Sequence, residues 1–182
     1  NSLKFKATFL LRGNHDIKKK KGKIISPLSF LSMKDSPYPY IQYVTDPTKI
    51  DLEGINCVFL PFKSHSEEQG MDIYKEGLDP SWYEDKEALV LGHFADTSNP
   101  DVREGSIDLT KFQGRVVLGH IHNPISDHYI GSVIPNAYSE KSYKRSYRVY
   151  SSFDKYEEKT IPSILEYLDV KFPSPLPKAS TK

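Results

Sequence analysis

The sequence predicts an α/β fold that is rich in strands. Short apolar runs with β-branched and aromatic residues recur between turn signals, whereas helical periodicity is sparse. Seven runs have the character of strands: 7–11, 40–44, 57–62, 88–91, 115–118, 129–133 and 147–153. One helix is expected at 27–33, with Ser26 as its N-cap and proline in its first turn. Weaker helical patterns cover 67–76 and 163–168.

Composition favours a water-soluble globular domain inside the cell. The 182 residues fit one ordinary domain, and the apolar share of 37% against 27% charged residues is typical of a folded chain. No apolar stretch is long enough to cross a bilayer, and the start at Asn1 lacks the apolar core of a signal peptide. We therefore expect a cytoplasmic protein.

The single cysteine and the balanced charge give no support to two broad classes of function, redox chemistry and nucleic-acid binding through global charge. Cys57 lies within an apolar run, which predicts a buried structural thiol rather than a nucleophile or a disulfide. The 25 basic and 24 acidic residues leave a net charge of +1. Global charge therefore gives no reason to expect nucleic acid as a partner, and any such case must be local.

Three predicted strands run directly into polar residues of the kinds that bind metals. The loops are Gly13-Asn14-His15-Asp16 after 7–11, Gly92-His93 after 89–91, and Gly119-His120-Ile121-His122 after 116–118. Buried strands of α/β proteins deliver such groups to the carboxyl edge of the sheet, where functional sites lie. Glycine lets the backbone turn there without a clash at Cβ. The repetition predicts one site built from three loops.

The residue types indicate a mixed nitrogen and oxygen site for divalent metals. Imidazole suits zinc, manganese, iron or nickel, and the carbonyl oxygen of Asn14 suits manganese or magnesium. In an extended strand end, His120 and His122 would lie on one side; in a turn, they could reach two ions about 3.5–4 Å apart. His15 could protonate a leaving alkoxide, and Asp16 could fix its tautomer or orientation.

These residues resemble the calcineurin-like metallophosphoesterase superfamily, whose motifs run DxH, GDxxD, GNH[DE], GH and GHxH. The last three match residues 13–16, 92–93 and 119–122. The resemblance implies a metallophosphoesterase-type αββα sandwich, of which this chain would supply the C-terminal, strand-rich part. It also implies specific roles: Asn14, His93 and His120 bind one metal, His122 binds the other, and His15 acts on the phosphate.

The stretch 115–122, followed by Tyr129-Ile130-Gly131-Ser132-Val133-Ile134-Pro135 and a polar segment at 136–144, is similar to SbcD-type DNA repair nucleases and phage recombination endonuclease subunits. That resemblance implies a DNA exo- and endonuclease with two divalent ions, manganese first and magnesium, iron, nickel or zinc as alternatives. It implies an SbcC-like SMC-type ATPase as partner, a homodimer, and the host cytoplasm if a phage encodes the chain. A generic phosphomonoesterase and a non-catalytic scaffold remain alternatives.

The first two motifs of the superfamily are missing, because neither Asp-x-His nor Gly-Asp-x-x-Asp occurs in these residues. We therefore expect a partial phosphoesterase domain at 1–160, a terminal helix or strand at 161–171 and a Pro-rich disordered tail at 172–182. A fragment, a split enzyme completed by a second chain, and a degenerate member would each explain the pattern. The first two are favoured because the later ligands are all present, and the chain alone is expected to be inactive.

Two basic segments are candidates for contact with nucleic acid. The lysine run directly after the first loop could hold a DNA backbone or be a solvated loop: Lys18, Lys19, Lys20 and Lys21. Arg145 belongs to a basic and aromatic segment at 138–150, which could face nucleic acid or form a hairpin with one polar face. Of the remaining histidines, His65 is expected at the surface or next to a metal ligand rather than as a ligand itself, and His128 is expected in a structural role. Trp82 and Phe94 are expected in the core.

Overall fold

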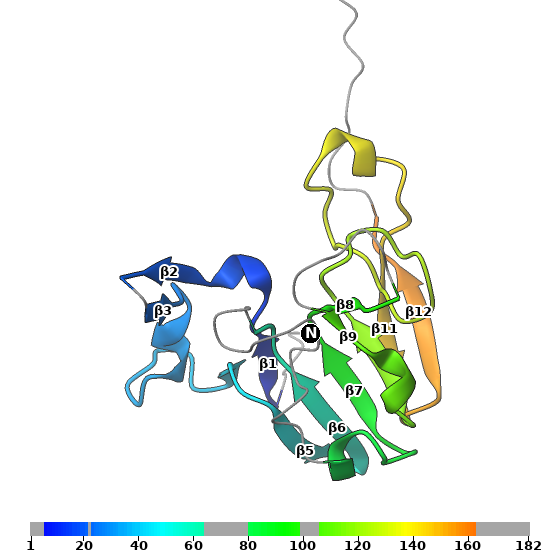
Figure 1. Ribbon diagram of the computed structural model, residues 1–182, viewed down its shortest axis with the longest axis horizontal. Coiled ribbons are helices and arrows are strands. Elements are labelled where there is room, and N and C mark those ends of the chain that lie inside the picture. The colour runs from blue at the N-terminus through cyan, green and yellow to red at the C-terminus, as the bar shows by residue number, and fades with distance from the viewer. Residues whose placement is uncertain (1–5, 22, 64–79, 99–105, 163–182) are drawn as a thin grey trace, which may run out of the picture.

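The computed structural model describes residues 6–21, 23–63, 80–98 and 106–162, which form a mixed α/β chain with strand-rich sheets and few helices (Figure 1). The helices within these ranges are short 3₁₀ turns: η1 (Asn14–Asp16), η2 (Ser29–Ser32), η3 (Pro80–Trp82), η4 (Leu109–Lys111) and η5 (Tyr138–Glu140). None of the helices in this part of the chain has the length and apolar character needed to cross a membrane.

A four-stranded sheet in the order β10-β7-β6-β5 forms the centre of the molecule. The strands β6 (Ile55–Leu60), β7 (Leu89–Gly92) and β10 (Arg115–Leu118) are parallel, and β5 (Thr48–Leu52) runs antiparallel to β6. The register places Val58, Val90 and Val116 side by side in one row across the three parallel strands.

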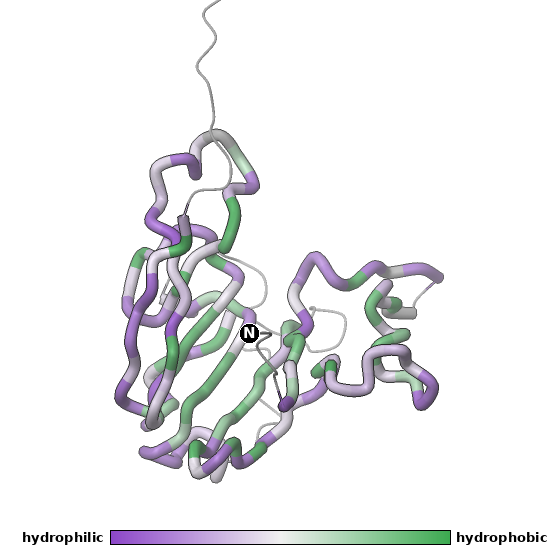
Figure 2. The backbone as a smooth tube through the Cα atoms, turned by 180° about the vertical axis from the view of Figure 1, so that it is seen from behind, coloured by the Kyte–Doolittle hydropathy of each residue, from purple (hydrophilic) through white to green (hydrophobic). Residues whose placement is uncertain are grey.

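Both faces of the central sheet are buried, which explains why its strands appear as nearly continuous apolar runs. Alternate residues face opposite sides of a strand. Val58 and Leu60 therefore join Val90 and Phe94 in one hydrophobic cluster, while the other face belongs to a second cluster around Phe59. The apolar colouring in Figure 2 follows these strands. Cys57 is buried in the second cluster, as predicted.

Strand β1 (Thr8–Leu11) pairs in parallel with β4 (Ile41–Val44) and packs on the second face of the central sheet. The ring of Phe9 stacks on Phe59 with centroids 5.0 Å apart. Beyond the end of β1, the carbonyl oxygen of Arg12 accepts a hydrogen bond from Phe62 N, which follows β6. The carboxyl ends of β1 and β6 are thus joined.

Three further strand pairs surround this body. The hairpin of β2 (Lys18–Lys20) and β3 (Lys23–Ile25) projects from it, and the hairpin of β11 (Ser146–Tyr150) and β12 (Tyr156–Thr160) lies on the opposite side (Figure 1). The shortest pair is β8 (Ala95–Asp96) with β9 (Ser106–Ile107).

The helix predicted at 27–33 is wrong, because the chain makes only the 3₁₀ turn η2 there. The N-cap of η2 is Leu28 and not the predicted Ser26, whose Oγ accepts a hydrogen bond from Leu28 N at 3.1 Å. The Ser29 hydroxyl, however, donates back to the carbonyl oxygen of Ser26. Serine side chains that bond their own backbone in this way compete with the helical ladder.

Six of the seven predicted strands are confirmed within a few residues, and the run at 129–133 is not a strand. That run makes a single parallel bridge, between Tyr129 and Leu118, before Gly131 turns the chain at φ +76°. The strands β2, β3, β5, β8, β9 and β12 were not predicted. Phe94 is fully buried and Trp82 packs on its cluster, as expected. The helices predicted at 67–76 and 163–168, His65 and the tail at 172–182 lie outside the described residues, and the division into domains stays a prediction.

Candidate metal centre

Backbone hydrogen bonds hold the three predicted loops together at the carboxyl ends of neighbouring strands. The bond from Phe62 N to Arg12 O at 2.8 Å joins the β1–β4 pair to the central sheet, and the bonds from His93 N to Leu60 O at 3.2 Å and from Gly119 N to Gly92 O at 2.9 Å continue the central sheet past its last strand residues. The loops after β1, β6, β7 and β10 are therefore fixed relative to one another. The three predicted loops meet as expected, although β1 belongs to a separate two-stranded sheet.

The side chains of Asn14 and His93 are in direct contact in this centre. The side-chain oxygen Oδ1 of Asn14 lies 3.0 Å from Nε2 of His93. Two ligand atoms at about 2.1 Å from one metal, with an angle near 90° between them, are about 3 Å apart. The observed spacing therefore suits two adjacent ligands of a single ion.

Two glycines enclose the imidazole of His93. A Cβ atom added to Gly13 would lie 3.0 Å from Cε1 and Nε2 of the ring, and one added to Gly119 would lie 2.9 Å from Nδ1. Neither glycine has a positive φ. Both positions are therefore restricted by the space that the His93 ring occupies rather than by the backbone conformation.

His120 completes the group, and its backbone is strained. Its φ of +77° lies in the left-handed region, which costs a residue that has a Cβ atom about 1–2 kcal/mol. The ring lies 5.4 Å from that of His93, centroid to centroid, and stacks on Phe62 at 6.1 Å. The structure therefore brings together Asn14, His93 and His120, the three residues predicted for one metal.

His93 is neutral at pH 7. Burial, followed by the charge of His120, lowers its pKa to about 4, and Asp16 opposes this shift. A neutral imidazole is the form that binds metal. His15 and His122 also lower the pKa of His93, so both are within electrostatic reach of it.

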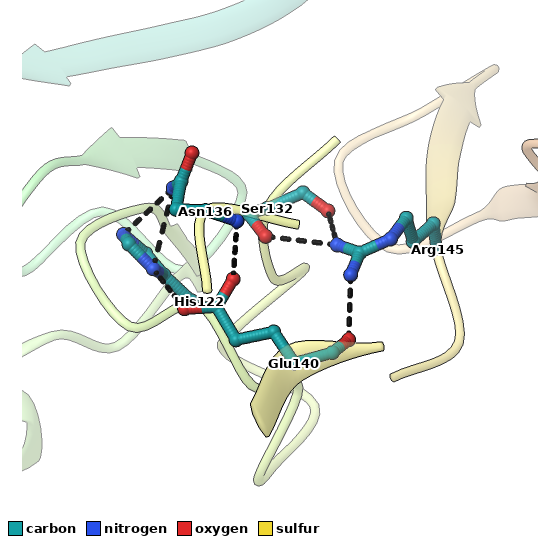
Figure 3. Close-up of polar contacts among 5 residues, drawn as sticks. All are labelled: His122, Ser132, Asn136, Glu140 and Arg145. Atoms are coloured by element: carbon teal, nitrogen blue, oxygen red, sulfur yellow. Dashed lines mark hydrogen bonds and ion pairs between the residues drawn. The ribbon is translucent and has the colours of Figure 1, made fainter. Parts of the chain in front are cut away.

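The imidazole of His122 is hydrogen-bonded to a different segment from the loops around His93. Its Nδ1 lies 2.8 Å from Oε1 of Glu140, and the side-chain nitrogen of Asn136 approaches the same ring (Figure 3). Strand β10 ends at Leu118, and the positive φ of His120 makes the following residues a turn. Of the two alternatives for the spacing of His120 and His122, the structure therefore has the turn and not the extended strand end.

The predicted catalytic residues lie in η1. His15 is exposed, as a group that must reach a substrate would be. Oδ2 of Asp16 accepts a hydrogen bond from Gly13 N at 2.7 Å and so closes the turn. The roles of His15 as an acid and of Asp16 as its orienting partner stay predictions.

The donors present fit part of a metal site. Within the described ranges, no three His, Cys, Asp or Glu side chains are grouped closely enough to hold an ion. Asn14, His93 and His120 offer one amide oxygen and two imidazole nitrogens, which suit manganese, iron, nickel or zinc. This set carries no negative charge and leaves coordination positions open. A carboxylate from another source would fit it.

The lysine run forms part of a hairpin rather than a loop, and its described side chains are exposed, as the solvated alternative expects. Lys18 and Lys20 belong to β2 and Lys21 turns the chain with φ +50°; all three side chains are exposed. Contact with DNA stays a prediction for these residues and for Lys19. Arg145 is 7% exposed, and its guanidinium bonds to Ser132 and to the carbonyl oxygen of Glu140. The nucleic-acid contact predicted for Arg145 would require these buried hydrogen bonds to break.

Glu140, Asn136 and Phe62 contact the predicted ligands but were not predicted from the sequence. Glu140 and Asn136 belong to the polar segment at 136–144, and nothing in its spacing distinguishes the one glutamate that turns inward. Phe62 ends an apolar run in which every residue has the pattern of core. His128 has the expected structural role, since its Nδ1 lies 3.1 Å from the Val116 carbonyl oxygen.

Comparison with known proteins finds no protein family model and no curated protein that matches this chain.

Proposed function

We propose that this chain contributes one half of a two-metal site that hydrolyses phosphodiesters, with DNA as the substrate. The observation that carries the proposal is the 3.0 Å contact between Asn14 Oδ1 and His93 Nε2, beside the ring of His120. The three donors come from three loops that are distant in sequence, and neutral donors at this spacing suit a divalent cation.

In this proposal each residue of the centre has a distinct task. A bound metal pair would supply hydroxide near neutral pH and polarise the phosphate. Asn14, His93 and His120 hold one ion, and His122 contributes to the other. The exposed imidazole of His15 hydrogen-bonds the phosphate and gives its proton to the leaving alkoxide. Gly13 and Gly119 leave room for the His93 ring and so fix its position.

We extend the proposal to the αββα sandwich of the metallophosphoesterases. The pair β1 and β4 packs on one face of the central sheet, which supports a two-layer arrangement of strands. The positions of the candidate ligands at the carboxyl ends of β1, β7 and β10 agree with the order of the superfamily motifs. The bridging carboxylate would then come from the Asp-x-His and Gly-Asp-x-x-Asp motifs on another segment or another chain.

DNA is favoured over a small phosphomonoester because a basic arm adjoins the centre. The hairpin β2–β3 follows η1 after one residue, so its exposed lysines begin three residues from His15. Lysines that neutralise backbone phosphates release counterions and so bind DNA without reading its sequence. An SMC-type ATPase of the SbcC kind is the partner that this function implies.

Manganese-dependent hydrolysis of linear DNA tests the proposal, with a nitrophenyl phosphate monoester as the competing substrate. The 182-residue chain would be assayed alone and combined with a polypeptide that carries the Asp-x-His and Gly-Asp-x-x-Asp motifs. We expect the combination to cleave DNA, and His93→Ala to abolish cleavage while His128→Ala retains it. Turnover of the monoester without cleavage of DNA would overturn the nuclease assignment.

A further inference from the structure

Both carboxylate oxygens of the buried Glu140 form hydrogen bonds, one of them to the candidate metal ligand His122. Oε1 lies 2.8 Å from Nδ1 of His122, and Oε2 accepts a hydrogen bond from the backbone N–H of Asn136 at 2.8 Å (Figure 3). The residue is 9% exposed.

A closed ring of hydrogen bonds joins Glu140 to His122 by a second route. Ser132 N donates to the His122 carbonyl oxygen at 3.0 Å, and Nη1 of Arg145 donates to the Ser132 carbonyl oxygen at 3.0 Å and to its hydroxyl at 2.9 Å. Nη2 of Arg145 then donates to the Glu140 carbonyl oxygen at 2.7 Å. Both ends of the Glu140–His122 bond are therefore anchored, and the anchor is a guanidinium with a rigid fork geometry.

The contact with Glu140 determines where the proton of a neutral His122 ring resides. An ionised carboxylate can only accept hydrogen bonds, so Nδ1 must carry the hydrogen and Nε2 must be bare. The side-chain nitrogen of Asn136 lies 3.4 Å from Nδ1 and 3.5 Å from Nε2. These nearly equal and long distances place it between the two ring nitrogens, not in a strong hydrogen bond to Nε2.

We propose that Glu140 is a positioning residue that fixes His122 as the Nδ1–H tautomer and presents the bare Nε2 to a divalent metal, with Arg145 holding Glu140 in place. The inference rests on the proposed function for the identity of the ligand. Carboxylates that bond the second nitrogen of a ligating histidine set its ring orientation, and their loss commonly weakens metal affinity about 10–100-fold.

Glu140→Gln separates this role from simple packing. The substitution keeps the shape of the side chain, but a glutamine has one acceptor oxygen where the glutamate has two. Asn136 N–H requires that acceptor, so the amide NH₂ group must face His122 and donate to Nδ1. The variant is therefore expected to retain the fold and to move the His122 proton to Nε2. Glu157→Gln, an exposed glutamate on β12, is the matched control.

The test is ¹⁵N NMR of the histidine side chains in the metal-free 182-residue chain, at about pH 8, where an ordinary imidazole is neutral. The His122 signal would be identified by its loss in His122→Gln. We expect the Nδ1–H pattern in the wild-type chain and in Glu157→Gln, and the Nε2–H pattern in Glu140→Gln. An Nε2–H pattern in the wild-type chain would overturn the proposal without the need for any variant, and an unchanged pattern in a folded Glu140→Gln would also overturn it.

A second measurement separates this inference from the proposed function. Manganese titrated into the complex with the motif-bearing polypeptide should bind at least about tenfold more weakly to Glu140→Gln than to the wild-type chain. Wild-type affinity in a variant whose tautomer has switched would overturn the metal-presenting role. If the tautomers are as expected but the protein binds no manganese, the orienting role of Glu140 is supported. Only the phosphoesterase proposal is then contradicted.

Discussion

Oδ1 of Asn14 and Nε2 of His93 lie 3.0 Å apart although 79 residues separate them in the chain. The contact forms because β1 and β7 both end at the same edge of the molecule, and because Gly13 leaves space for the His93 ring. The importance of the space around the His93 ring can be tested by substituting the glycine next to it.

Gly13→Ala is expected to weaken metal binding about tenfold, and the crowding at this buried position should lower the free energy of unfolding by about 1–3 kcal/mol. The new Cβ would meet the His93 ring at 3.0 Å, yet the φ of −99° at Gly13 suits alanine. Manganese titration and urea unfolding would measure the two effects.

Gly54→Ala is the matched control for Gly13→Ala and should lose stability without losing metal affinity. Gly54 forms the turn between β5 and β6 with φ +85°, and nothing lies within 4 Å of an added Cβ. The left-handed conformation should therefore cost about 1–2 kcal/mol of stability, with metal affinity unchanged. Equal effects of the two substitutions on metal binding would show that the space around His93 is not what matters.

Arg145→Lys should destabilise the fold by about 1–3 kcal/mol, because a lysine cannot reproduce the forked bonds to Ser132 and Glu140 in a buried position. Urea unfolding would measure the change in the free energy of unfolding, with Lys144→Arg at an exposed position as the control. If Arg145 instead acts only as a surface cation for DNA, the lysine variant will keep wild-type stability.

The β2–β3 hairpin is predicted to supply most of the salt-dependent affinity for DNA. Combined substitution of Lys18, Lys20 and Lys21 by glutamine should make the slope of log affinity against log salt shallower by up to roughly 3, about 0.9 for each phosphate that the variant no longer neutralises. Fluorescence anisotropy with labelled duplex DNA would measure it. A triple variant at exposed lysines elsewhere, Lys34, Lys86 and Lys155, is the control, and an equal change of slope there would remove any special role for the hairpin.

Asp85 is predicted to make stability depend on pH below about 4. The backbone N–H of Glu87 donates to its carboxylate at 3.0 Å, and this bond, followed by those from Lys49 and Asn56, lowers its pKa from the ordinary 3.8. A lowered pKa means that the stabilisation is present above pH 3.8 and is lost as the pH falls through the folded-state value. Unfolding of Asp85→Asn between about pH 2 and 7 should show a weaker acid dependence than the wild type. Glu84→Gln, at the exposed neighbouring residue, should retain the wild-type dependence.

The central strands could be predicted from sequence because both of their faces are buried, which makes runs such as 57–62 continuously apolar. The hairpin β2–β3 could not, because lysine has a low preference for strands and this arm has no apolar alternation. Strand β5 does alternate, but its polar Lys49 and Asp51 conceal a half-buried strand at the sheet edge. Tyr129 begins an apolar run that Gly131 ends, since a positive φ cannot continue a strand.

The ligand-bearing loops were predicted because each follows a buried strand, and parallel strands carry their ends to one edge. Sequence could not show that the ring of His93 lies between two glycines, since that depends on the distance between loops. It also could not select Glu140 from a polar segment, because the inward orientation of its carboxylate depends on contacts with His122 and with the backbone N–H of Asn136. The separate surroundings of His120 and His122 follow from a backbone turn at His120 that no residue type requires.

Manganese binding by the chain combined with a polypeptide that carries the Asp-x-His and Gly-Asp-x-x-Asp motifs, measured by isothermal titration calorimetry at neutral pH, tests the central claim most directly, because Asn14, His93 and His120 all belong to the proposed site. The account predicts saturable, stoichiometric binding that falls at least about tenfold in His93→Ala and in His120→Ala and is unchanged in His128→Ala. Absence of binding in the wild-type combination, or equal binding with all four versions of the chain, would contradict it.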